Sequence, residues 1–134
     1  MHYEIRIDAD ARLIRLSVDG LVNVPDFLKA CEEIFEHPEF DPHFNRLTHL
    51  GRAALLGEIT PEDIRTVGRR LHEMQQRFRT GEPVLSAIVG EREEHRPLLQ
   101  LYVLAHGGHS RVTERIFDRV SDALAWLSEG MPPK

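Results

Sequence analysis

The clearest pattern of apolar and polar positions lies in the middle of the chain. From residue 60 to 78, apolar side chains recur every three or four positions (Ile64, Val67, Leu71, Met74, Phe78), which predicts an amphipathic helix. Thr60 can cap the free N–H groups of this helix, and Pro61 is tolerated in its first turn. A short strand at 46–50 is expected before the helix, and an apolar loop at 51–59 joins the two.

The remaining elements follow from the same kind of pattern. Strict alternation predicts strands at 2–7, 13–18 and 112–117, the second ended by Asp19-Gly20. A continuous apolar run at 84–89 predicts an interior strand covered on both faces. Further helices are expected after the Asn23-Val24-Pro25-Asp26 start, ending at His37-Pro38, and at about 97–106 and 119–128.

This order of elements predicts an α/β fold with a single mixed sheet. About five strands and about four helices follow one another as β-β-α-β-α-β-α-β-α, in which the opening hairpin is antiparallel and the later crossovers are parallel. A chain of 134 residues is most simply one domain. We expect this domain to cover residues 1–129 and to be followed by a flexible tail at 130–134.

Composition and charge exclude several classes of protein. A formal net charge of −5 argues against nucleic acid as the main partner. The single cysteine, Cys31, cannot form an intramolecular disulfide and is expected to be a small buried side chain. The sequence contains no apolar run long enough for a transmembrane helix, and its start resembles a strand rather than a signal peptide. The cytoplasm is the expected location, and peripheral contact with a membrane stays open.

The sequence lacks the combinations of residues that catalysis or metal binding requires. His106 and His109 could supply at most half of a zinc site. Glu91, Glu93 and Glu94 are interpreted as solvated charges near a helix start rather than as an acid–base pair. A nucleophile elbow, a phosphate loop and a dinucleotide fingerprint are absent. We therefore expect no enzymatic activity, no metal and no cofactor.

Five segments together resemble the SpoIIAA-like bacterial proteins of the STAS superfamily. They are the opening hairpin, His37-Pro38-Glu39-Phe40, Gly51-Arg52, the helix start at 59–64 and Val-Ser-Asp-Ala-Leu-Ala-Trp-Leu at 120–127. The resemblance implies a STAS-like mixed sheet with helices mainly on one face. It also implies a non-enzymatic role, either partner binding as in anti-sigma regulation or binding of lipid-like molecules as in CRAL-TRIO domains. The phosphorylatable serine of the STAS antagonists has no counterpart, because residues 51–59 contain neither serine nor threonine.

The apolar loop Ala53-Ala54-Leu55-Leu56 is the candidate site. It follows the carboxyl end of a strand, where open α/β sheets bind ligands. Together with the helix at 97–106 it could line a pocket or a partner surface. The residues expected there are Ala53, Leu55, Leu56, Leu98, Leu101 and Tyr102. The alternative is that the loop packs back onto the core.

Two functions are therefore expected. The first is a regulatory module that binds a protein partner, without a phosphorylation switch and expected as a homodimer. The alternative is a carrier or sensor of a small apolar or lipid-like molecule. An enclosed apolar cavity beside Leu56 would favour the carrier, whereas exposure of residues 53–56 at a two-fold contact would favour the partner-binding module.

Overall fold

The computed structural model describes residues 1–78, 83–106 and 112–129, apart from the side chains of 105 and 106. The elements are β1 (His2–Asp8), β2 (Leu13–Leu21), α1 (Val24–Glu36), β3 (Asn45–Leu55), α2 (Pro61–Phe78), β4 (Val84–Gly90), η1 (Glu93–His95), α3 (Arg96–His106), β5 (Val112–Phe117) and α4 (Val120–Glu129). The predicted order is confirmed, and the short 3-10 turn η1 is an addition to it. His109 and the predicted tail at 130–134 lie outside the described residues.

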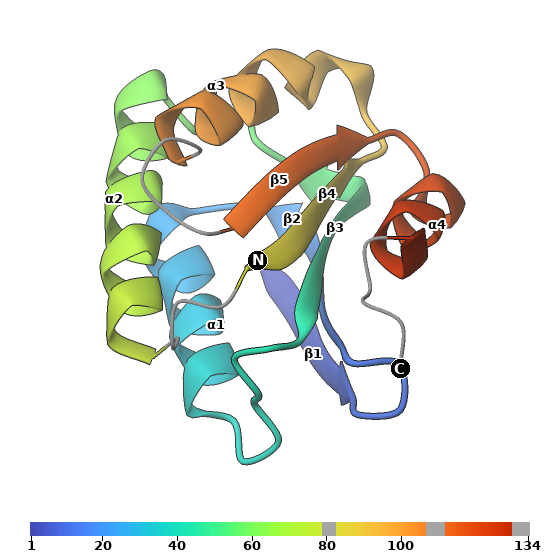
Figure 1. Ribbon diagram of the computed structural model, residues 1–134. Helices are drawn as coiled ribbons and strands as arrows, with labels where there is room; N and C mark the ends of the chain where they lie inside the picture. Colours follow the sequence, from blue (N-terminus) through green and yellow to red (C-terminus); the bar gives the residue numbers. More distant parts are fainter. Residues whose placement is uncertain (79–82, 107–111, 130–134) are drawn as a thin grey trace.

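The five strands form one mixed sheet in the order β1-β2-β3-β4-β5 (Figure 1). β1 and β2 pair antiparallel, and the other three neighbouring pairs are parallel. β4 lies between β3 and β5, and most of its residues are buried, as its continuous apolar run predicted. The predicted α/β class with a mixed five-stranded sheet and four helices is thus confirmed for the described part of the chain.

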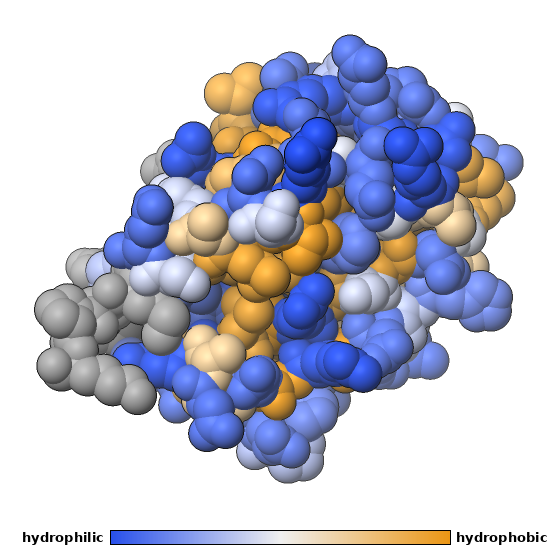
Figure 2. Space-filling view, turned by 90° about the vertical axis from the view of Figure 1, so that its right-hand side faces the viewer, coloured by the Kyte–Doolittle hydropathy of each residue, from blue (hydrophilic) through white to orange (hydrophobic). Residues whose placement is uncertain are grey.

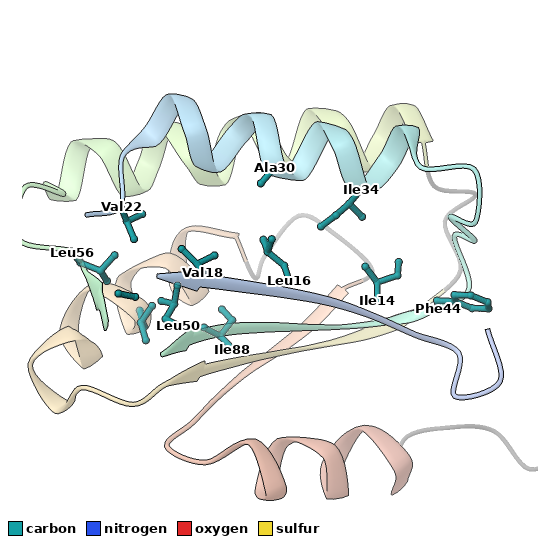
Figure 3. Packing of buried hydrophobic residues seen from close by; sticks show 12 residues of the cluster. Ile14, Leu16, Val18, Val22, Ala30, Ile34, Phe44, Leu50, Leu56 and Ile88 are labelled. Atoms are coloured by element: carbon teal, nitrogen blue, oxygen red, sulfur yellow. The ribbon is translucent and has the colours of Figure 1, made fainter. Parts of the chain in front are cut away.

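Three helices cover one face of the sheet and α4 covers part of the other (Figures 1 and 3). Below α1, the side chains of Ile14, Leu16 and Val18 point from β2 toward the helix layer and are almost fully buried (Figure 3). On the opposite face, Ala123 and Leu127 of α4 pack against β3 and β4. Around α4, apolar side chains stay partly exposed between polar ones (Figure 2).

The prediction that β2 and β3 end early is wrong. β2 continues past Asp19-Gly20 to Leu21, and β3 continues through most of the predicted loop to Leu55. The two extensions pair with each other after an irregularity in the ladder, where Gly20 adopts a φ of 78°. Glycine is suited to that conformation because it has no Cβ. This pairing satisfies backbone groups that a loop would leave to water.

The two predicted capping sequences begin helices as expected. The Asn23 side chain accepts a hydrogen bond from the Asp26 N–H at 2.9 Å, at the start of α1. At the start of α2, the Thr60 hydroxyl accepts from the Asp63 N–H at 3.1 Å, and Asp63 accepts from the Thr60 N–H at 3.0 Å. This reciprocal pair is the geometry of a capping box, and it fixes where α2 leaves β3.

α2 packs mainly against α1 and α3 rather than directly on the sheet. Its apolar stripe, including Leu71 and Met74, meets Cys31 and Phe35 of α1. Cys31 is fully buried, as predicted. Within the described residues, no helix has both the length and the apolar character needed to cross a membrane. Because its neighbouring helices support α2, space is left between α2 and the strands below it.

Candidate functional site

An apolar cavity of about 80 Å³ lies between the sheet and the helices that cover it. Its floor consists of inward-facing side chains of β3, β4 and β5. Its walls come from the start of α1, from α2 and α3, and from the segment between β3 and α2. Most of the lining is aliphatic, with Leu50, Leu56, Ile64, Val67, Ile88 and Leu99 among the contributors. The cavity can therefore hold a small apolar group.

A polar row crosses the floor of this cavity. Arg46 of β3 is in register with Ser86 of β4, and Ser86 is in register with Glu114 of β5. Residues in register on neighbouring strands point to the same face of a sheet. The Ser86 hydroxyl donates to the Glu114 carboxylate at 3.3 Å, and the Tyr102 hydroxyl of α3 also hydrogen-bonds to Glu114. Three strands and one helix thus bring four polar side chains together.

Arg46 is the positively charged residue at the β3 end of this row. Its side chain is 7% exposed, its Nη2 donates to the Cys31 sulfur at 3.3 Å, and its Nε is buried without an acceptor. Burial alone would lower the pKa of Arg46, but Cys31, Tyr102 and Glu114 outweigh that effect and raise the pKa. The guanidinium therefore stays charged beside an apolar cavity.

Two further polar groups border the cavity. Burial, followed by the charge of Glu114, raises the pKa of Tyr102 well above its ordinary value, so the phenol stays protonated and donates. Gln75 of α2 lines the cavity as well, and its Oε1 is buried without a donor. In the part of the chain that the structure describes, the cavity lining thus includes a donor on Arg46 and an acceptor on Gln75 that have no hydrogen-bond partner.

One end of the cavity is closed by contacts between the segment after β3 and the start of α3. The Leu56 N–H donates to Nε2 of the buried His95 at 3.4 Å. Leu99 of α3 lies so close to Gly90 that a Cβ at Gly90 would be 2.6 Å from the Leu99 side chain. Gly90 therefore lets α3 approach β4 and closes this side of the cavity.

The Leu56–His95 bond should make the protein less stable in acid. Burial lowers the pKa of His95, so the native state favours the neutral imidazole, which accepts from Leu56. This contribution is fully present above the unfolded pKa of about 6.5 and is lost as the pH falls through the lower folded pKa. We expect the unfolding free energy to fall with pH less steeply in His95→Gln than in the unmodified protein, as measured by urea denaturation.

His2→Gln is the matched control for this prediction, because His2 is exposed on β1 and its replacement should leave the pH dependence unchanged. Equal slopes below pH 6.5 in His95→Gln and in the unmodified protein would contradict the role given to His95.

The six residues predicted for the site fall in three places. Leu56 is buried, and Leu56 and Tyr102 line the cavity. Leu98 and Leu101 are partly buried on α3, where the neighbouring Leu99 is the one that reaches the cavity. Ala53 and Leu55 are exposed at the end of β3. Alternate residues of this extended segment point to opposite sides, so Ala53 and Leu55 face solvent while Leu56 faces the core. Residues 53–56 therefore do not form a single continuous surface.

Sequence reasoning missed Arg46, Ser86 and Glu114 as site residues, although the pattern held a signal. Glu114 occurs in the same alternation phase as Val112 and Ile116 in β5, which is the phase that faces inward. A charged residue in an inward phase is unusual, because a buried charge needs a partner. Such a residue indicates a buried polar site.

Comparison of the chain with protein-family models, with curated proteins and with solved structures finds no match. The resemblance to the STAS superfamily therefore stays a prediction. A functional proposal has to rest on the cavity and its polar row.

Proposed function

We propose that this domain is a non-enzymatic binding module that holds a small apolar molecule in the cavity below α2, as a carrier or a sensor. The observation that supports the proposal is the apolar cavity itself, with a charged arginine at its floor. The sequence led us to expect either a partner-binding module or, as the alternative, a carrier or sensor of a small apolar molecule. The position of Leu56 in the cavity wall favours the carrier or sensor.

Energetics support a ligand in this cavity. Protein interiors are usually packed without voids larger than a water molecule. Side chains that line an unfilled space of about 80 Å³ lack packing contacts on that side. An engineered apolar cavity of about 150 Å³ binds benzene, so the present cavity suits an apolar group of a few carbon atoms. A molecule that fills it would recover the lost contacts and add to the stability of the protein.

The arrangement of the elements supports a STAS-like fold as part of this proposal. The chain opens with an antiparallel hairpin, continues with alternating helices and parallel strands, and has three of its four described helices on one face. These features agree with what the STAS resemblance implies. The ligand-binding alternative within that resemblance is the role that fits a cavity between sheet and helices.

Native mass spectrometry of gently purified protein tests the proposal. We expect a fraction of the protein to carry a small non-covalent adduct, which denaturation in organic solvent releases for identification. The Ile64→Phe variant should lose this adduct, because Ile64 lines the cavity and a larger ring would fill it. Its unfolding temperature should stay the same or rise, since filling a cavity typically stabilises a protein.

Leu104→Phe is the matched control, because it enlarges an apolar side chain that is 79% exposed on α3. That variant should keep the adduct at the level of the unmodified protein. An adduct that survives unchanged in Ile64→Phe would show that the molecule binds elsewhere, and the proposal would then be wrong.

A partner-binding role is the second candidate, and it rests on one observation. Leu21 and Leu55 are paired neighbours at the ends of β2 and β3, and they are 45% and 43% exposed. Two adjacent exposed leucines favour contact with another apolar surface. The same native mass spectrum tests this role, because a homodimer through this pair should be lost in Leu55→Ser.

A further inference from the structure

We infer, building on the proposed function, that the ligand is a short apolar carboxylic acid whose carboxylate binds Arg46 at the floor of the cavity.

The hydrogen bonding of Arg46 leaves room for such a ligand. Among the described residues its buried Nε has no acceptor, and its Nη2 donates to the sulfur of Cys31 at 3.3 Å. A cysteine sulfur is a weak acceptor. A guanidinium presents its donors as a planar fork that matches the two oxygens of a carboxylate. A carboxylate would therefore supply the strong acceptor that the protein does not give to Nε.

The positive charge of Arg46 also favours a ligand that carries a carboxylate. A buried charge is strongly unfavourable unless it is paired and hydrogen-bonded, and Arg46 is 7% exposed. Glu114 lies in the same row, but its carboxylate accepts from the Ser86 and Tyr102 hydroxyls. A ligand carboxylate would bring a negative charge directly to the guanidinium.

The cavity also limits the size and shape of the acid. The space of about 80 Å³ is bounded mostly by aliphatic side chains outside the polar row, so the body of the ligand should be short and apolar. Gln75 offers one additional polar contact, and its amide can turn either the oxygen or the nitrogen toward the ligand. Butyrate has the required features, with a carboxylate on a short aliphatic chain, and butan-1-ol is its neutral counterpart.

Titration with butyrate and with butan-1-ol tests the inference, with amide chemical shifts of the full chain measured by NMR at pH 7. We expect butyrate to bind at least about tenfold more tightly than butan-1-ol, the usual effect of a hydrogen bond to a charged group. The shifts should be confined to residues around the cavity, such as Thr48 and Leu56.

Arg46→Met should abolish the preference for butyrate while butan-1-ol still binds. Arg46→Met alone leaves Glu114 without its positive neighbour, so the test is repeated in Arg46→Met/Glu114→Gln. Replacement of both members of a buried charged pair is often neutral or stabilising, whereas removal of one is destabilising. Arg46→Lys is a second variant, which keeps the charge but loses the fork and should retain only part of the preference. Arg52→Met is the matched control, because Arg52 is exposed near the end of β3 and should not affect either probe.

The possible results separate this inference from the proposed function. Equal binding of butyrate and butan-1-ol, or a preference that survives in Arg46→Met, would overturn the role of Arg46 and leave the apolar binding site intact. Absence of cavity-specific shifts with either probe would overturn both. Tighter binding of butyrate that disappears in Arg46→Met but not in Arg52→Met would support the inference.

Discussion

Leu71→Ala should destabilise the protein by about 3 kcal/mol, the middle of the range for truncating a buried leucine. Leu71 is 1% exposed and lies in the apolar cluster between α2 and α1. Since α2 packs mainly on its neighbouring helices, a void in this contact weakens its attachment. Urea denaturation should show a lower midpoint, and hydrogen exchange should become faster in α2 than in the central strands.

Leu28→Ala is the matched comparison, because Leu28 is only partly buried in the same cluster. We expect it to lower the unfolding free energy clearly less than Leu71→Ala does. A loss in Leu71→Ala no greater than that in Leu28→Ala would mean that this contact does not hold α2 in place above the cavity.

Glu114→Gln should destabilise the protein by about 2 kcal/mol. The substitution removes the carboxylate that lies in the same row across the sheet as the buried, positively charged Arg46. The amide also gives poorer acceptors to the hydroxyls of Ser86 and Tyr102, which hydrogen-bond to Glu114. The loss should appear in urea denaturation at neutral pH as a lower midpoint than that of the unmodified protein.

A double-mutant cycle with Arg46→Met separates the two causes of this loss. If the charge of Arg46 dominates, Glu114→Gln should be nearly neutral in the Arg46→Met background. An equal loss in both backgrounds would assign the effect to the hydroxyl hydrogen bonds alone. The cycle therefore measures how strongly Glu114 stabilises the charge of Arg46 in the absence of ligand. Arg46 is the residue that we propose to bind the ligand carboxylate.

Local sequence signals predicted most of the fold. The capping sequences at Asn23 and Thr60 act within one helical turn, so their effect does not depend on the rest of the chain. The spacing of apolar residues in α2 and the alternation in β1 and β5 likewise reflect the geometry of a single element. The β-β-α-β-α-β-α-β-α order then restricts the sheet to a few topologies, of which the mixed one was expected.

The ends of β2 and β3 could not be predicted in this way. Asp19-Gly20 is a typical turn sequence, and the segment after Leu50 contains small residues that have no strong strand preference. Their extended conformation depends on pairing between strands that are distant in the chain, such as Gly20 with Ala54. This long-range pairing decides that Leu56 faces the core while Leu55 faces outward.

The sequence by itself determined the elements, their order and the inward phase of Glu114, because each depends on neighbours within a few residues. Only the tertiary structure brought Arg46, Ser86 and Glu114 into one row, since the register of parallel strands is set by crossovers between them. The cavity is likewise a tertiary property. It exists because α2 packs on α1 and α3 and is thereby held away from the sheet. No single segment of the sequence encodes this distance between α2 and the sheet.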